Sequence, residues 1–192
     1  PEVQTVVSQL AKKITGKQIA GFWSDWEKQV KPGLKKLVKS AVGGTVTGTR
    51  RIGKHIVIDL DNGHSLVIHL KMSGHLLYKD VANKDALEWQ DPMNRFIHHR
   101  IDFTDGSWVD FSDLRKFGWI DCVATHTVET MKSIALLGCD ALAGECHLNF
   151  FEALLKKNKQ KRIATLLLEQ DKIAGIGNIY RSEMLYRAGI RP

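Results

Sequence analysis

The period of the hydrophobic pattern changes once along the chain, and this change is the strongest constraint on the fold. From Lys17 to Phe117, apolar and polar residues alternate with a period near two, as in strands that bury one face. Two turn sequences, Asp61-Asn-Gly63 and Thr104-Asp-Gly106, each separate two such runs and predict antiparallel hairpins. After Thr127 the apolar residues recur at helical spacing. The sequence therefore predicts an α+β protein, with an antiparallel sheet assembly, a domain boundary near residues 124–130 and then helices.

Helices are predicted on both sides of the sheet region. At the start of the chain, apolar residues recur at helical spacing from Val3 to Ile14, with Pro1 in the first turn and Gly16 as the stop signal. The helical runs that come after the sheet region are residues 134–137, 148–155 and 163–168.

Positive charge is concentrated in two segments. Lys and Arg number 28 against 21 acidic residues, which gives a formal net charge of +7. One group of lysines lies between Lys28 and Lys39, and the other is the run from Lys156 to Arg162. Solubility alone does not require such clustering, so the pattern favours a polyanionic partner such as a nucleic acid.

The cysteines are few and widely spaced. Cys122, Cys139 and Cys146 are odd in number and include no Cys-x-x-Cys pair, so we expect neither a disulfide framework nor a complete zinc site. A reducing, cytoplasmic setting fits this usage best. The sequence contains no apolar stretch of membrane-spanning length and no signal sequence.

Two glycines mark the stretch Ile173–Ser182. Gly175 and Gly177 precede an apolar, helix-forming run, which predicts a tight turn that leads into a helix N-terminus. Such an end attracts anions, because its backbone amides and the helix dipole point outward. Asn178 adds an amide donor there, and the run Lys156–Arg162 adds charge. An ordinary helix-turn-helix is the alternative interpretation of the glycines. A polyanion backbone would account for both Asn178 and the run Lys156–Arg162.

Three loops of the sheet region carry side chains that suit DNA contact. Lys54 lies at a strand start, where a lysine is usually solvated. Met72 precedes a Ser-Gly turn and is either core filler or a flexible apolar probe. Arg115 and Phe117 are two residues apart, hence on one side of an extended loop, where a guanidinium can bond a base edge or phosphate and a ring can wedge between bases. Core packing is the alternative for Phe117.

Together, and in this order, these segments resemble the formamidopyrimidine-DNA glycosylase (Fpg/Nei) family of base-excision repair enzymes. The resemblance spans nearly the whole chain, and its most specific part is the run from Leu166 to Ile190. The matching segments are Pro1-Glu-Val3, Arg51–Lys54, His69–Leu70 with Met72–Gly74, Asp113 with Arg115–Gly118, and, in the last run, Gln170, Ala174–Tyr180, Glu183 and Ala188–Ile190.

The resemblance implies a bilobal enzyme of the α+β class. Residues 1–124 would form an N-terminal antiparallel β-sandwich flanked by helices, and residues 125–192 a partial helix-two-turn-helix DNA-binding domain. The family continues into a zinc finger, so one zinc is expected beyond Pro192 and no cofactor within this chain. The implied partner is damaged double-stranded DNA, and no membrane association is expected. The protein would be a monomer in a bacterial-type cytoplasm, where it would associate with the nucleoid.

The resemblance also implies the chemistry. The family flips an oxidised base out of the duplex, here with oxidised purines favoured, and attacks the sugar C1′ with the amine of an N-terminal proline. The resulting Schiff base is an iminium ion, an electron sink through which the abasic strand is cleaved. By match to the family pattern, the catalytic residues are Lys54, near the reacting sugar and phosphate, with Glu2 and Pro1. The DNA-binding residues by the same match are Met72, His98, Arg115, Phe117, Lys159, Lys161, Asn178 and Tyr180.

The start of the chain departs from the family pattern. The family begins Pro-Glu-x-Pro-Glu-Val, and the helical run after Val3 matches the family's residues after its second Pro-Glu pair. We therefore expect three further residues upstream, including the nucleophilic proline and its glutamate. Pro1 as the nucleophile is the minority interpretation.

Single positions also depart from the pattern. Lys71, Leu114 and Ala164 replace a glycine, a proline and a phosphate-contacting lysine of the family. Phe96 occupies the position of a DNA-binding histidine, and His98 is the next histidine that matches. Phosphate binding would then depend more on the lysines of the run from Lys156 to Arg162.

Two other functions compete with a bifunctional glycosylase and AP lyase. One is a non-catalytic DNA-binding module that keeps the wedge and the phosphate clamp but has lost the nucleophile. The other is a basic RNA-binding protein, which accounts for the charge but not for the ordered set of loops. The residues that precede Pro1 in the full gene distinguish the first two functions.

Overall fold

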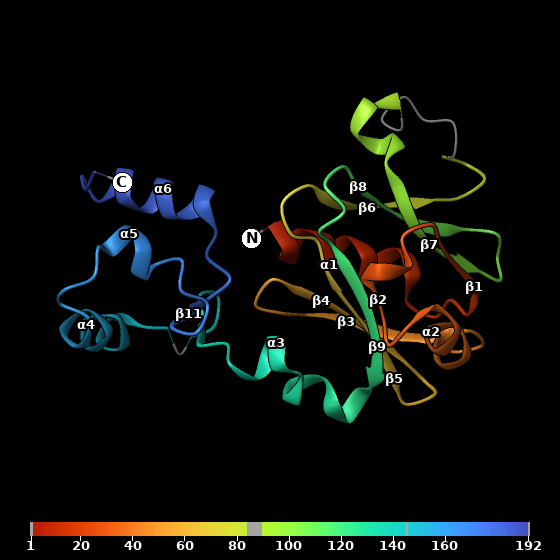
Figure 1. Cartoon of the computed structure of the whole chain (residues 1–192), viewed down its shortest axis with the longest axis horizontal. Coiled ribbons are helices and arrows are strands. Elements are labelled where there is room, and N and C mark those ends of the chain that lie inside the picture. Colours follow the sequence, from red (N-terminus) through yellow and green to blue (C-terminus); the bar gives the residue numbers. More distant parts are fainter. Residues whose placement is uncertain (1, 84–89, 145, 192) are drawn as a thin grey trace. The chain divides into compact units, whose positions relative to one another are not determined.

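The structure, a computed structural model, describes residues 2–83, 90–144 and 146–191 of the chain (Figure 1). Its contacts divide it into two compact units. Unit 1 comprises the chain up to Arg51 and residues His55–Val128, whereas unit 2 comprises Ile52–Lys54 and the chain from Glu129 onward. The hairpin tip at Ile52–Lys54 therefore belongs, by its contacts, to the unit that the C-terminal part of the chain forms.

Unit 1 contains two sheets. The five-stranded sheet has the order β2-β9-β5-β4-β3, and the four-stranded sheet has the order β1-β7-β8-β6. The first comprises β2 (Val30–Lys31), β9 (Trp119–Ala124), β5 (His64–His69), β4 (His55–Leu60) and β3 (Val46–Ile52). The second comprises β1 (Ile19–Ser24), β7 (Ile97–Phe103), β8 (Trp108–Asp113) and β6 (Gly74–Lys79). The pairing of β2 with β9 is parallel, and β1–β7, β7–β8, β6–β8, β4–β5 and β5–β9 are antiparallel.

One hydrophobic core joins both sheets to two helices. Helix α1 (Glu2–Ile14) contributes Leu10 and Ile14, and helix α2 (Leu34–Ala41) contributes Leu37. These side chains share a cluster with buried residues of both sheets, such as Ile68 and Phe111. Because burial of apolar surface is the main favourable term in folding, this shared core is what makes unit 1 a sandwich. The α+β class and the sandwich with flanking helices are confirmed.

Both hairpins expected from the turn sequences form. The β4–β5 pair places Ile58 opposite Leu66 around the turn at Gly63, and the β7–β8 pair places Ile101 opposite Val109. Gly63 has φ 78° and the second turn glycine, Gly106, has φ 82°. This left-handed conformation favours glycine because it brings a Cβ against the backbone.

Short 3-10 helices connect the larger elements: η1 (Glu27–Gln29) and η3 (Pro92–Arg95) in unit 1, and η4 (Thr125–Thr130) where the chain passes into unit 2. Unit 2 is helical, with α3 (Lys132–Ala135), α4 (Leu148–Lys157), α5 (Ile163–Leu166) and α6 (Asn178–Arg187). Two short strands, β10 (Cys139–Asp140) and β11 (Ile173–Ala174), pair in parallel within it. Its core is small and comprises Leu154, Leu166, Leu167, Ile173, Ile176 and Leu185. Among the described residues, no helix has the length and apolar character needed to span a bilayer.

Two helical segments differ from expectation. Helix α2 was not anticipated, because its lysines obscure an apolar face of which only Leu37 and Ala41 are fully buried. The helical run expected at residues 134–137 forms only the four-residue helix α3, which ends at Ala135. There the amide of Leu137 bonds the carbonyl of Ile134, and Gly138 lies against the backbone of Lys172, so the chain turns away.

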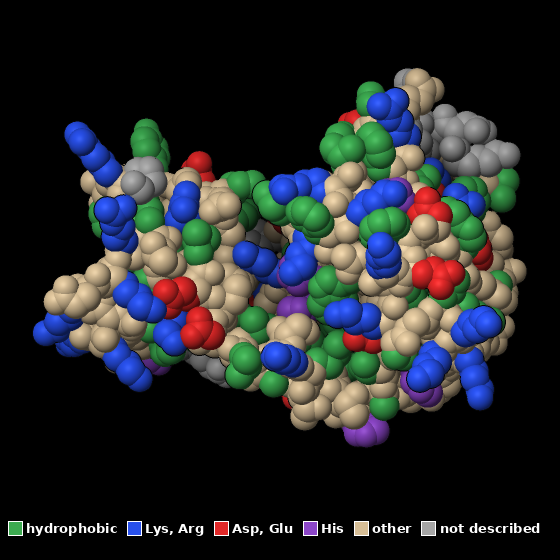
Figure 2. Space-filling model, viewed as in Figure 1, with side chains coloured by type: hydrophobic (Ala, Val, Ile, Leu, Met, Phe, Trp, Pro, Cys, Tyr) green, Lys and Arg blue, Asp and Glu red, His purple; other side chains and the backbone are tan. Residues whose placement is uncertain are grey.

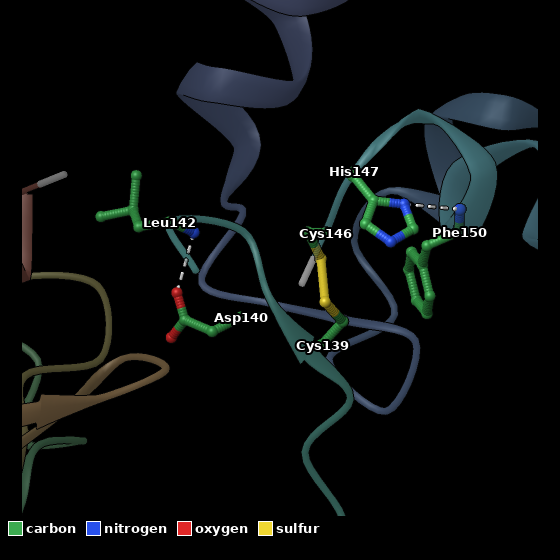
Figure 3. The surroundings of a disulfide bond; sticks show 6 residues. All are labelled: Cys139, Asp140, Leu142, Cys146, His147 and Phe150. Atoms are coloured by element: carbon green, nitrogen blue, oxygen red, sulfur yellow. Dashed lines mark hydrogen bonds between the residues drawn. A yellow bond between two sulfur atoms is a disulfide. The ribbon is translucent and has the colours of Figure 1, made fainter. Parts of the chain in front are cut away.

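The expectation that the cysteines form no disulfide framework missed one bond. Cys139 and Cys146 are bonded, with their Cα atoms 5.9 Å apart (Figure 3). Successive turns bring them together, since the amide of Ala143 donates to the carbonyl of Asp140 at 2.9 Å and the amide of Cys146 donates to that of Ala143 at 3.2 Å. Spacing in the sequence could not reveal these turns. The remaining cysteine, Cys122, is a buried free thiol.

Gly138 provides a test of this packing. A Cβ at Gly138 would lie 2.3 Å from the carbonyl oxygen of Lys172, and backbone cannot yield as a flexible side chain can. We expect Gly138→Ala to lower the free energy of unfolding by about 1 to 3 kcal/mol, the range for overpacking. Gly144→Ala is the matched control, because nothing lies within 4 Å of a Cβ there. Urea unfolding followed by circular dichroism measures both, and equal stability of the two variants would contradict the packing.

Candidate nucleic-acid interface

The first part of the candidate interface lies where unit 1 passes between its sheets. Strand β5 pairs with β9 in one sheet, and β6 pairs with β8 in the other. The connections β5–β6 and β8–β9 therefore both cross between the sheets, side by side. Little space exists at the crossing, because a Cβ on Gly74 would lie 2.4 Å from the carbonyl oxygen of Leu70, and one on Gly118 2.4 Å from the ring of Phe111.

The carboxylate of Asp113 organises both connections. Its Oδ2 accepts hydrogen bonds from the amides of Phe117 at 2.8 Å and Gly118 at 2.7 Å. Its Oδ1 accepts from the hydroxyl of Ser73 and, at 3.2 Å, from the amide of Arg115. Burial by itself raises the pKa of Asp113, but these hydrogen bonds outweigh it and hold the pKa below the ordinary value. Asp113 is thus an anion that fixes two loops at once.

The fixed loops present three side chains together. Met72 is 73% exposed and Phe117 48% exposed, although both are large and apolar. Arg115 lies between them: its Nη1 is 2.9 Å from the sulfur of Met72, and its guanidinium carbon is 4.7 Å from the ring centroid of Phe117. Core packing, the alternative for Phe117, does not describe a side chain with this exposure. We call Met72, Arg115 and Phe117 the exposed triplet.

Two residues of these loops have left-handed backbone without being glycine. Lys71 has φ 57° and Lys116 has φ 55°. Lys71 stands where the family pattern has glycine, and its φ explains why glycine suits that position. Such conformations cost free energy and persist where the surrounding structure over-determines them, which happens often at functional sites.

The second part of the candidate interface lies in unit 2, at the N-terminus of α6. Gln170 shapes the preceding turn: its Oε1 accepts from the amide of Gly175 at 3.0 Å, and its Nε2 donates to the carbonyl of Ile176 at 2.9 Å. Gly175 has φ 97°, as a tight turn requires. Gly177 differs from expectation, because its φ of −118° is extended backbone open to any residue.

Positive charge converges on this helix end. The Nζ atom of Lys54 lies 3.4 Å from where a Cβ on Gly177 would be. Asn178 begins α6 and is exposed, Tyr180 lies in its first turn, and that turn contains no acidic residue. An ammonium group beside the outward amides of a helix N-terminus favours an anion.

The lysine-rich turn after α4 is also exposed. Lys159, Lys161 and Arg162 are exposed, but Nζ of Lys161 lies 2.7 Å from a carboxylate oxygen of Glu169. Lys161 is therefore already paired with an internal anion. On the face drawn in Figure 2, Lys and Arg side chains clearly outnumber Asp and Glu.

The remaining sequence-based site residues do not join these two parts. His98 is 8% exposed and its Nδ1 is 2.8 Å from a carboxylate oxygen of Asp25, and its assignment as a DNA-binding residue stays a prediction. The guanidinium carbon of Arg95 lies over the ring of Phe96, 5.1 Å from the ring centroid. Glu2 is exposed at the start of α1. Pro1 lies outside the described residues.

Sequence reasoning gave no role to Asp113 and Gln170, the two side chains that shape the loops. A signal exists for each, since a polar side chain five residues before a loop glycine can reach the glycine amide: Asp113 before Gly118, and Gln170 before Gly175.

Comparison with known protein families finds a match for each of the two parts of the chain. The family model of the formamidopyrimidine-DNA glycosylase N-terminal domain matches residues 1–120, and that of the formamidopyrimidine-DNA glycosylase H2TH domain matches residues 137–192. A sandwich unit followed by an H2TH unit defines the chain as a helix-two-turn-helix protein. The chain belongs to the formamidopyrimidine-DNA glycosylase family.

Individual relatives agree with this assignment. The chain is 37% identical to a formamidopyrimidine-DNA glycosylase of Chloroflexus aggregans and 34% identical to one of Pelotomaculum thermopropionicum. Both alignments include the whole chain, and they cover 66% and 67% of the two relatives. A crystal structure of the Lactococcus lactis glycosylase bound non-covalently to DNA with an AP site superimposes with a TM-score of 0.86 at 30% identity, over the whole chain and 70% of that structure. The chain thus spans about two thirds of its curated relatives.

The anionic state of Asp113 provides a test of the first part. Asp113→Asn should lower the free energy of unfolding at pH 7 by about 1 to 3 kcal/mol, because backbone amides lose a charged acceptor. Since the pKa of Asp113 is lower in the folded state, its contribution is complete above the unfolded value and is lost as pH falls through the folded value. The difference in melting temperature between wild type and variant should therefore shrink below pH 3.8. A difference independent of pH would contradict this role.

Proposed function

We propose that the full-length protein is a base-excision repair glycosylase with AP lyase activity that removes oxidised bases, purines in preference, from duplex DNA. The observation that carries the proposal is the exposed triplet, held rigidly by a buried carboxylate. A large thioether and a phenyl ring expose apolar surface to water, and together with the neighbouring guanidinium they suit the space that a flipped base leaves.

The exposed triplet would act on the stack of bases. Flipping a nucleotide costs a few kcal/mol of lost stacking and pairing. Met72 and Phe117 would fill the vacated space with apolar contact, and the guanidinium of Arg115 would bond the edge of the unpaired partner base. Because Asp113 fixes the loops in advance, little ordering is left for the moment of contact.

The helix end in unit 2 would hold the DNA backbone. The amides that begin α6, the side chain of Asn178 and the ammonium group of Lys54 supply donors and positive charge for one phosphate. Lys159 and Arg162 would add contacts that do not depend on base sequence. The relatives with solved complexes include the Lactococcus lactis enzyme with DNA that contains N7-benzyl-Fapy-dG, at a TM-score of 0.85 and 29% identity.

The covalent step would use an N-terminal proline amine. Its nitrogen attacks the sugar C1′, and the C1′–base bond breaks with a proton delivered to the leaving base. The C1′–O4′ bond then breaks as the amine proton is transferred to O4′, which leaves a ring-opened sugar joined to the proline as an iminium ion. Glu2, or the glutamate beside an upstream proline, is the acid-base group of this proposal, and Lys54 stabilises the reacting sugar and phosphate. Among the described residues, no group of three or more His, Cys, Asp or Glu side chains could hold a metal ion.

Incision and trapping test this proposal. The full-length protein should nick a duplex that contains a formamidopyrimidine lesion, and borohydride should link it covalently to abasic DNA, because reduction traps only an iminium ion. Lys54→Gln should lower incision far more than Lys157→Gln, an exposed lysine at the end of α4. DNA binding without incision or crosslinking would instead identify the non-catalytic DNA-binding module.

A second experiment separates stacking from phosphate contact. Phe117→Ala and Met72→Ala should raise the barrier to excision of a paired lesion by about 1 to 3 kcal/mol per lost contact, with much less effect at a preformed abasic site, where unstacking is already cheap. Asn178→Ala should weaken binding to damaged and undamaged duplexes about equally, because phosphates are alike at every sequence.

Leu114→Ala is the matched control for Phe117→Ala, since Leu114 is in the same loop and is 47% exposed. Melting by circular dichroism reports folding of each variant. If Phe117→Ala destabilised the fold and impaired both substrates alike, Phe117 would be a packing residue.

A further inference from the structure

The disulfide of unit 2 links β10 to the segment at the start of α4. Cys139 lies in β10, opposite Ile173 of β11. Cys146 lies next to His147, the N-cap of α4, whose Nδ1 accepts from the amide of Phe150 at 3.3 Å (Figure 3). The sulfur–sulfur bond therefore joins a strand directly to the start of a helix.

The strand side of the bridge leads to the helix end that carries Lys54 and Asn178. The amide of Ala141 donates to the carbonyl of Ala174 at 3.0 Å, and that of Gly138 donates to the carbonyl of Gln170 at 2.9 Å. Ala174 immediately precedes the turn that Gln170 shapes. A displacement of β10 would therefore move both Gln170 and Ala174, which flank that turn.

The helix side of the bridge leads to the lysine-rich turn. Helix α4 runs from Leu148 to Lys157, has Lys156 and Lys157 in its last turn, and is followed directly by Lys159, Lys161 and Arg162. Leu154 anchors α4 in the small core of unit 2. One end of the bridge is thus connected to the N-terminus of α6, and the other to the lysine-rich turn after α4.

We propose that Cys139 and Cys146 form a reversible redox switch that controls DNA affinity by coupling the lysine-rich turn to the N-terminus of α6. This inference rests on the proposed DNA binding. In the oxidised form the bridge holds both segments in one arrangement, so less conformational freedom is lost when a duplex binds. In the reduced form β10 and α4 lose this covalent link and keep the hydrogen-bonded turns between Asp140 and Cys146, so the affinity is lower.

The redox step is a thiol–disulfide exchange with a small-molecule disulfide such as glutathione disulfide. One protein thiolate attacks the small disulfide, forms a mixed disulfide and releases one glutathione thiolate. The second protein thiolate attacks the mixed disulfide and releases the other glutathione. The protein loses two protons and two electrons, one S–S bond forms, and two glutathione thiols result.

The third cysteine provides an internal reference. Cys139 and Cys146 are both partly exposed, whereas Cys122 is buried in β9. Burial, with a smaller effect of the Asp121 charge, raises the pKa of the Cys122 thiol to about 11, so its reactive thiolate is scarce at neutral pH. Alkylation of the native chain therefore counts the switch cysteines alone, and Cys122 reacts only after denaturation.

The first experiment determines the redox state of the 192-residue chain in glutathione buffers of graded ratio. Mass spectrometry after alkylation should find two accessible thiols under reducing conditions and none under oxidising ones, with Cys122 unmodified until denaturant is added. Failure of Cys139 and Cys146 to bond in excess glutathione disulfide would overturn the proposal.

The second experiment measures binding of an undamaged duplex by both redox forms. The oxidised form should bind roughly three- to tenfold more tightly, as expected when ordering of a few side chains is removed from the binding step. Cys146→Ser and Cys139→Ser should bind like the reduced form in either buffer, and Cys122→Ser should keep the full response. Equal affinity of two forms whose redox states are verified would overturn the switch.

A third measurement does not depend on DNA. Hydrogen exchange at the amides of Gly138, Ala141 and Gly175 should be slower in the oxidised form, because the first two amides join the residues beside β10 to Gln170 and Ala174, and the third closes the turn before α6. If neither redox form bound DNA, the proposed function would fail, and unchanged exchange would separately overturn the mechanical coupling.

Discussion

A single buried carboxylate determines how unit 1 can present side chains to a partner. Where the chain passes from one sheet to the other, Gly74 and Gly118 leave no room for a side chain, so the two connections lie against each other. Their backbone amides then need an acceptor, and Asp113 supplies it. Because a buried charge is tolerated only with several hydrogen bonds, the loop amides and the carboxylate each require the other. Exposure of Met72 and Phe117 is a result of this arrangement.

Unit 2 uses the same principle with a neutral side chain. The amide group of Gln170 accepts from Gly175 and donates to two carbonyls, so one side chain closes the turn before α6. The two units differ in the cores that surround these polar groups. Unit 1 has a core shared by two sheets and two helices, whereas the core of unit 2 is small. Small cores rarely stabilise a fold alone, and covalent bonds often supplement them, as the bond between Cys139 and Cys146 does here.

The features that the sequence predicted depend on local patterns. Alternation and the two Gly turns predicted the hairpins, and the glycine-marked run before Asn178 predicted the start of α6. The features that it missed depend on contacts between distant segments. His98 pairs with Asp25, 73 positions earlier, and no local pattern encodes a contact at that separation. The exposure of Phe117 likewise results from Asp113 and Ser73 together, so the sequence could suggest the exposed triplet but could not decide between wedge and core.

The pairing of Lys161 with Glu169 affects how strongly the lysine-rich turn can bind a phosphate. A phosphate that approaches Lys161 must displace a carboxylate that is already bound. Exposed ion pairs contribute up to about 1 kcal/mol, so this internal competitor can weaken a phosphate contact by roughly fivefold. The carboxylate also offers the lysine a partner each time a phosphate leaves. In the proposed function, such an exchange would lower the barrier between successive phosphate positions along a duplex.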